Sequence, residues 1–88
     1  MKRDEYRHFD GEMLQTATGP QGYFELGMMY TTGAPVPVDF VSAHKWFNLA
    51  AMAGHQHATR LRHEIAAEMS TAEITTAQRA ARAYLTRH

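Results

Sequence analysis

Histidine is the residue type in this sequence with the widest chemical potential. The chain has 88 residues, with six histidines and no cysteine, which excludes thiolate metal sites and cysteine nucleophiles. His55, His57 and His63 lie close together in the sequence, and three imidazoles could hold zinc in a small metal-dependent enzyme. However, His57 and His63 are six residues apart, so they face different sides of a helix, and no H-E-x-x-H motif is present. We therefore predict no metal site and no cofactor, and keep histidine-based metal binding only as an alternative.

The other residue types used in catalysis lack the patterns that would activate them. Ser42 and Ser70 are the two serines of the chain, and neither lies in a nucleophile-elbow sequence. The glycines lack the Gly-Lys step of a phosphate-binding loop. His44 precedes Trp46 but lies off the apolar stripe of its helix, so we expect its imidazole in solvent. The sequence therefore predicts a protein that is not an enzyme.

Charge and hydropathy restrict the partners of the chain. Nine Lys and Arg residues balance nine Asp and Glu residues, and a neutral chain lacks the basic face that nucleic acid requires. No apolar run approaches the ~20 residues of a membrane helix, and the charged N-terminus does not resemble a signal peptide. The absence of cysteine fits a reducing compartment. We expect one small cytoplasmic domain with neither nucleic acid nor membrane as a partner.

The spacing of apolar residues predicts an all-α fold of four to five helices. Helices are expected at about 22–32, 39–54, 56–68 and from 70 onward, with a further one at 3–17. The stretch 18–22 contains Gly and Pro and is expected to break the chain between helices. Asp39 is suited to cap the second helix, and Ser70 with Glu73 forms a capping box. The last helix should bury a stripe made of Ile74, Ala77, Ala81, Tyr84 and Leu85.

Small and large residues alternate in the middle of the chain at spacings suited to a tight helix hairpin. Glycine and alanine let two helices approach closely, and large apolar side chains fill the facing gaps. Residues 22–57 resemble one unit of the Sel-one-like repeat family, a branch of the tetratricopeptide-like α/α solenoids. The matching positions are Leu26, Gly27, Tyr30, Gly33, Val36, Asp39, Ala43, Trp46, Ala50, Ala51, Gly54 and Ala58.

The resemblance covers less than half of the chain. Gly22 and Pro35 depart from the family pattern, and downstream Leu61-Arg62 stands near the position of the expected Leu-Gly. We therefore divide the chain into an N-terminal helix or degenerate half-repeat at 1–21, one repeat at 22–57, and a C-terminal capping helix pair at 58–88. The resemblance implies a short α/α superhelix of antiparallel helix hairpins, as in small repeat proteins of bacterial type.

Phe24 and Met28 are the residues that the hairpin pattern leaves unexplained. They lie four residues apart, so they form one apolar ridge away from the stripe of the first helix. Phe9 or Met13 of the N-terminal segment could cover this ridge, or a second copy of the chain could. In solenoids of this type the first helices line the concave face, which implies a partner-binding surface at Phe24, Glu25, Met28 and Thr31.

The repeat and the lack of catalytic groups together favour a protein-interaction function. We expect an adaptor module that binds a protein or peptide through the first helix. The alternative is a structural unit that forms a homodimer through its exposed repeat end, because one repeat is short of the number that usually gives stability. The sequence names neither the partner nor the oligomeric state.

Overall fold

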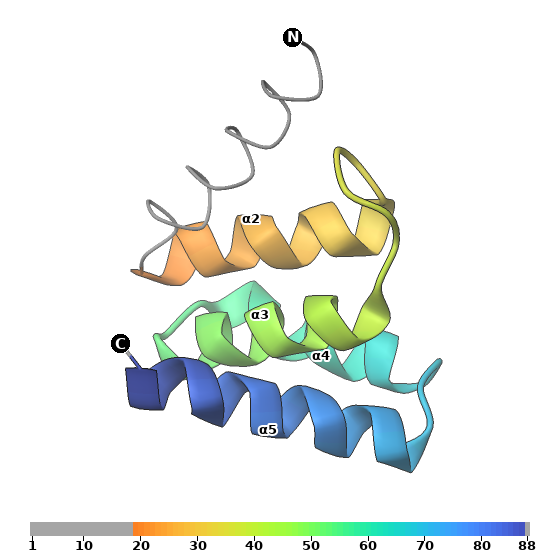
Figure 1. Ribbon diagram of the computed structural model, residues 1–88. Helices are drawn as coiled ribbons and strands as arrows, with labels where there is room; N and C mark the ends of the chain where they lie inside the picture. Colours follow the sequence, from red (N-terminus) through yellow and green to blue (C-terminus); the bar gives the residue numbers. More distant parts are fainter. Residues whose placement is uncertain (1–18, 88) are drawn as a thin grey trace, which may run out of the picture.

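The computed structural model describes residues 19–87, and these residues form four α-helices and no strand. The helices are α2 (Gly19–Thr32), α3 (Phe40–Met52), α4 (Gln56–Ala66) and α5 (Thr71–Arg87). Consecutive helices run antiparallel, so that α2 with α3 and α4 with α5 make two hairpins (Figure 1). The all-α fold class is therefore confirmed. The expected helix at 3–17 lies outside the described residues.

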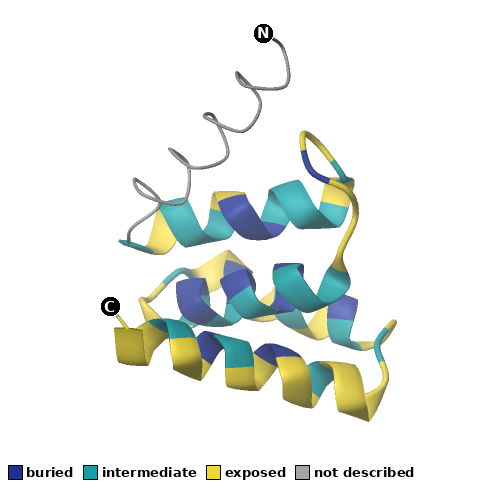
Figure 2. Cartoon of the chain, viewed as in Figure 1, coloured by how far each residue is buried: buried dark blue, intermediate teal, exposed yellow. Residues whose placement is uncertain are grey.

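Helix α3 is the centre of the fold. It packs extensively against α2 and also against α4 and α5, whereas α4 and α5 contact each other much less. One core cluster joins Leu26 of α2 to Trp46 and Leu49 of α3 and Ala81 of α5. A second cluster joins Phe47 and its neighbours on α3 to α4. Figure 2 shows the buried residues concentrated on α3, with exposed residues along the outer side of α5.

The first helix begins earlier than the sequence indicated. Gly19 and Pro20 were expected in a break, but they form the first turn of α2. Proline suits this position because its missing N–H would have no partner in the first turn of a helix. Gly19 has a φ of 78°, which a glycine adopts without the steric cost of a Cβ. The expected start at Gly22 was therefore wrong by three residues.

The connection between α2 and α3 follows the sequence prediction. Gly33 ends α2 with a φ of 79°, and its N–H donates to the carbonyl of Met29. Val36 points inward and is buried. Asp39 caps α3, because its carboxylate accepts a hydrogen bond from the N–H of Ser42 at 3.2 Å. The positive φ of Gly54, 104°, marks the other end of the helix.

The second hairpin is also well defined at its ends. The Ser70 N–H donates to Glu73 Oε1 at 2.8 Å, and the Glu73 N–H donates to Ser70 Oγ at 3.1 Å. This reciprocal pair is the predicted capping box. Helix α4 ends at Ala66, two residues before the expected end. Leu85 is 45% exposed, contrary to expectation, because Tyr84 takes the inward position in the last turns and packs against Trp46.

A membrane span would need a long and uniformly apolar helix. None of the four helices between residues 19 and 87 combines the length and the apolar character that crossing a bilayer demands.

Candidate functional site

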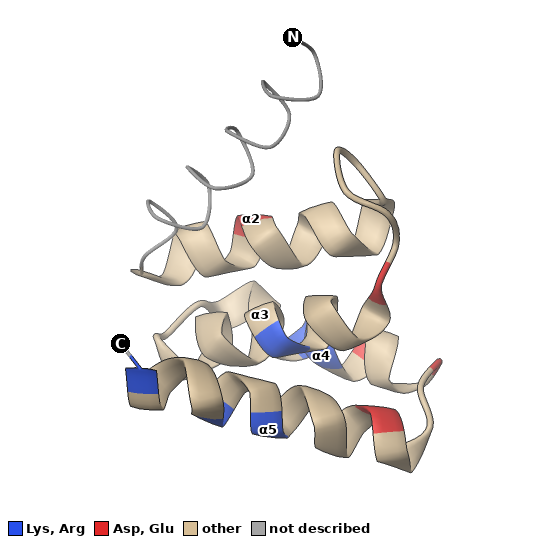
Figure 3. Cartoon of the chain, viewed as in Figure 1, with Lys and Arg blue, Asp and Glu red and all other residues tan. Residues whose placement is uncertain are grey.

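Helix α2 differs from the other helices in charge. Glu25 is its one charged residue, and α2 has no Lys or Arg, whereas α3, α4 and α5 all carry basic side chains (Figure 3). Glu25 is exposed, and it accepts a 3.3 Å hydrogen bond from the amide of Gln21. The surface of α2 therefore presents a single negative charge among apolar and uncharged side chains.

Phe24 lies half-buried along one edge of α2. Its ring stacks on the imidazole of His55, with centroids 4.1 Å apart and planes 8° from parallel. It also meets Phe47 at 5.6 Å. His55 in turn lies 3.2 Å from Gln21 through its Nε2 atom. The Phe24 side chain is thus held in place by contacts from α3 and from the turn that precedes α4.

Met28 and Thr31 continue the same edge of α2. Met28 is half-buried and packs against the cluster around Phe47. The Thr31 hydroxyl donates a 2.8 Å hydrogen bond to the carbonyl of Gly27. The structure therefore brings Phe24 and Met28 into contact with the core of the hairpin, although the helical wheel placed them off the stripe. Their assignment to a partner-binding surface, together with Glu25 and Thr31, stays a prediction.

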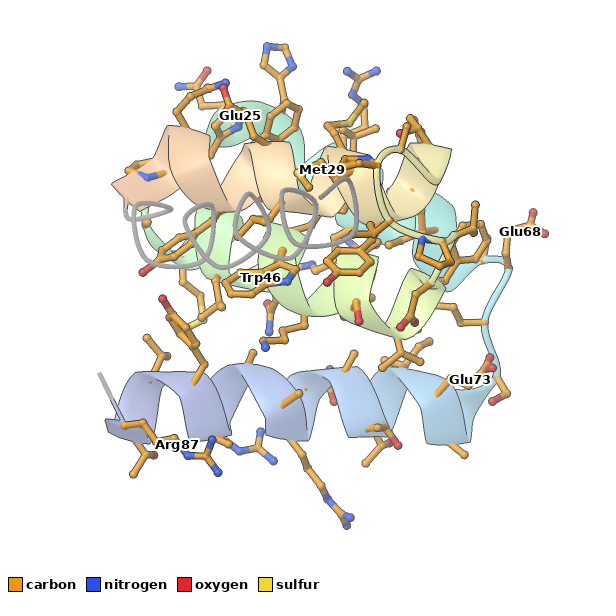
Figure 4. The ribbon with its side chains drawn as sticks, turned by 45° about the horizontal axis from the view of Figure 1, so that its top comes forward. Glu25, Met29, Trp46, Glu68, Glu73 and Arg87 are labelled. Carbon is orange, nitrogen blue, oxygen red and sulfur yellow. The ribbon has the colours of Figure 1, made fainter. Side chains whose placement is uncertain are left out.

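The opposite edge of α2 contributes to an aromatic cluster. Tyr23 stacks on Trp46 with ring centroids 5.9 Å apart, and Tyr84 meets Trp46 edge-on at 5.1 Å. Lys45 places its Nζ 4.3 Å from the Trp46 ring centroid, a cation–π geometry. Figure 4 shows Trp46 between α2 and α5, while Glu25 lies on the far side of α2 from α5. The side chains on both edges of α2 therefore pack against other elements. The face of α2 that carries Glu25, called the outer face, is not covered by another helix of residues 19–87.

In the part of the chain that the structure describes, the histidines do not form a metal-binding group. His55 and His57 have ring centroids 5.9 Å apart, and His63 lines a different region of the surface. Within residues 19–87, no three His, Asp or Glu side chains are arranged to hold a metal ion. The expected solvent exposure of His44 was wrong, because this residue is only 3% exposed.

His44 is buried because α3 is covered on more than one side. A helix at the surface would expose its polar face, but α4 and α5 cover the face of α3 that carries His44. Burial lowers the pKa of His44 from 6.5, and the charges of Arg62 and His63 lower it further. Its Nδ1 has no hydrogen-bond partner in the described chain. Such an atom typically costs about 1–3 kcal/mol of stability.

Sequence reasoning missed the importance of the residues around His44. The available signal was Arg62-His63, a polar pair that lies five residues into the second unit, where the repeat has Leu26-Gly27. The loss of the repeat pattern was identified at Leu61-Arg62, and His63 was not connected with it. Its consequence for the surface between α4 and α5 was not predicted, because it depends on which helices cover α3.

Two antiparallel hairpins, the second packed against helix α3 of the first, define a short protein of the α/α solenoid class. The family model described as Sel1 repeat matches residues 20–55, which are α2, α3 and the turns around them. Residues 20–55 are therefore a Sel1-like repeat, and the match is confined to the first hairpin. Sel1 repeats in general mediate protein–protein interactions and are typically non-enzymatic. No curated protein and no solved structure matches the chain significantly.

Proposed function

We propose that the chain is an adaptor module that binds an apolar peptide or helix of another protein through the outer face of α2. The binding residues would be Phe24, Glu25, Met28 and Thr31. The division into residues 1–21, 22–57 and 58–88 belongs to the same proposal, with the binding face on the repeat and the last segment as a cap.

The charge pattern of α2 carries this proposal. Among residues 19–87, α2 packs chiefly against α3, yet Phe24 and Met28 stay half-buried rather than buried. A half-exposed aromatic ring beside a methionine is a surface that partner proteins favour, since methionine adapts its shape and offers polarisable sulfur. The single charge at Glu25 then selects a partner that carries Lys or Arg beside its apolar residues.

The contacts of Phe24 and Met28 determine which variant can test the site. Both side chains pack against the cluster around Phe47, so replacing them with Asp would disturb the fold as well as the surface. Glu25 is exposed, and its carboxylate accepts a hydrogen bond from the amide of Gln21. Glu25→Arg therefore reverses the charge of the face with little effect on stability.

The experiment places a photo-crosslinking amino acid at Glu25 or, as a control, at Arg79 on the outer side of α5. Both residues are exposed. Expression in the native cell, followed by irradiation and mass spectrometry, should yield a partner at position 25 and none at 79. In a second experiment the photo-crosslinking amino acid is placed at Thr32. Glu25→Arg should then abolish the cross-link to the partner, whereas Glu64→Arg on α4 should leave the cross-link unchanged. Equal cross-linking at 25 and 79 would contradict the proposed face.

Sedimentation velocity of the purified protein tests the self-associating alternative. A dimer that Glu25→Arg separates would mean that the face binds a second copy of the chain instead of another protein. A monomer at high protein concentration would remove the homodimer.

A further inference from the structure

A cavity lined by both polar and apolar side chains lies between α3, α4 and α5. Its volume is about 310 Å³, which is at the lower end of the range for small-ligand sites. Its lining includes His44, Asn48, Arg62, His63, Ile74 and Gln78. It opens on the second hairpin, away from the face of α2 described above.

The cavity exists because the second hairpin lacks the side chains that fill the first. Gly27 lies five residues after Gly22, where the repeat begins, and His63 lies five residues after Ala58, where the next unit begins. Phe47 is the eighth residue after the N-cap Asp39, and Gln78 is the eighth after Ser70. A close Gly–Phe contact in the first hairpin is thus replaced by a His and a Gln in the second. Polar side chains therefore line a gap that an aromatic ring would have filled.

The lining carries positive charge without a carboxylate to balance it. The Arg62 guanidinium donates a 2.6 Å hydrogen bond to Asn48 Oδ1. No Asp or Glu lines the cavity. An arginine beside a neutral amide keeps its full charge, and its remaining N–H groups can donate to an anion.

His44 adds a second observation that points to a ligand. It lines the cavity while being only 3% exposed, and its Nδ1 has no partner in the described chain. Burial is the main cause of the lowered pKa of His44, and the charges of Arg62 and His63 act in the same direction. A negatively charged ligand beside Arg62 would oppose the effect of these charges on His44.

We propose that this cavity binds a small organic carboxylate, with Arg62 hydrogen-bonded to the carboxylate, His44 beside it in the wall, and Ile74 in contact with a short apolar body. The proposal goes beyond partner binding on α2 and does not depend on it. Inorganic phosphate would meet the same Arg62, but it would leave Ile74 and much of the volume unused. The apolar wall therefore favours a branched or linear acid of a few carbons over a bare anion.

The test titrates isobutyrate into the intact protein, observed by the NMR signals of the His44 ring and by calorimetry. We expect saturable binding with a shift of the His44 signals. Isobutyramide, which has the same shape without the charge, should bind at least about tenfold more weakly, since charge-assisted hydrogen bonds are the stronger ones. A further titration distinguishes a free small acid from the C-terminus of a peptide. It uses acetyl-Ala-Val with a free C-terminus and, for comparison, the same peptide with an amidated C-terminus. If only the free-ended peptide binds, the carboxylate comes from a peptide, and the proposal of a free small acid is overturned.

The variant pair is Arg62→Gln and its control Arg60→Gln, which changes an exposed residue on the same helix outside the cavity. Arg62→Gln should weaken isobutyrate binding about tenfold or more, and Arg60→Gln should leave it unchanged. If Arg62→Gln does not fold, the comparison of isobutyrate with isobutyramide on the native chain still tests whether the cavity binds a carboxylate. Equal binding of isobutyrate and isobutyramide, equal loss in both variants, binding of inorganic phosphate alone, or no binding of isobutyrate at all would each overturn the proposal.

Discussion

The two hairpins of this chain have similar helix caps and different interiors. In the first, Gly27 lets the ring of Phe47 approach so closely that a Cβ on residue 27 would lie 2.5 Å from two ring carbons. In the second, α4 and α5 leave a cavity of about 310 Å³. Both hairpins have a side-chain cap at the start of their second helix. The difference shows that caps define where helices begin, whereas small and large residues decide whether two helices close on each other.

The largest expected effect comes from the ring that closes the first hairpin. Phe47→Ala should lower the free energy of unfolding by about 3–5 kcal/mol, because Phe47 is fully buried and its removal leaves a void. Gln78→Ala, at the corresponding position of the second hairpin, should change stability by less than about 0.5 kcal/mol. Urea unfolding followed by circular dichroism measures both. Similar losses in the two variants would show that the hairpins are packed alike.

Gly27→Ala tests the close approach itself. The added methyl group would overlap the buried Phe47 ring, and overpacking of this kind costs about 1–3 kcal/mol. His63→Ala in the second hairpin should have an effect below about 0.5 kcal/mol, because His63 is exposed. The measurement is again the urea midpoint. Unchanged stability in Gly27→Ala would mean that the ring can move aside.

Removing the helix cap of either hairpin should lower the stability of the chain by a similar amount. Asp39→Ala and Ser70→Ala should each cost about 1 kcal/mol, since each removes an acceptor for a free N–H of the first turn. Thermal unfolding of the two variants, beside Ser42→Ala as a control that keeps the Asp39 cap bond to the Ser42 N–H, measures the difference. A cost at one cap only would contradict the view that both helix starts are equally defined.

The pH dependence of stability should be small and should come from His44, which lies on α3 where α4 and α5 cover it. The pKa of His44 is below its ordinary value of 6.5 in the folded chain, with burial as the main cause. As the pH falls through 6.5, the unfolded chain binds a proton at this position that the folded chain does not bind, so the free energy of unfolding decreases. The decrease continues until the pH reaches the lower pKa of the folded state.

His44→Leu should therefore lose less stability than the native chain between about pH 7 and pH 5. His57→Gln, which changes an exposed histidine, serves as the control and should behave like the native chain. Denaturation curves at several pH values measure the slope. If the free energy of unfolding of His44→Leu falls with pH as steeply as that of the native chain, a group other than His44 causes the loss of stability at acid pH.

Local sequence signals predicted the parts of the fold that depend on neighbours along the chain. Gly33, Asp39 and the Ser70–Glu73 pair act within one turn of their helices, so their residue types alone indicated their roles. The start of α2 was wrong because proline was interpreted as a break, although the first turn of a helix accepts it. Leu85 was predicted to be buried because it follows the spacing of the apolar stripe. Spacing alone does not show that Tyr84, rather than Leu85, packs against Trp46.

The candidate sites depended more on tertiary structure. Glu25 and its neighbours could be selected from the pattern of α2, and they stay a prediction as a binding face. His44 could not be selected, because a histidine off the apolar stripe is usually in solvent. Only the positions of α4 and α5 around α3 bury it and bring it beside Arg62.

The sequence by itself determined the class of this protein. A dozen residues in the order of the family pattern specified one Sel1-like repeat. Close helix packing requires small residues at fixed spacing, and this spacing is visible in the sequence before the fold is known. The tertiary structure decided how the second hairpin sits on the first. That arrangement depends on contacts between residues far apart in the chain, which no local pattern encodes, and it brings His44 of α3 beside Arg62 of α4 at the cavity.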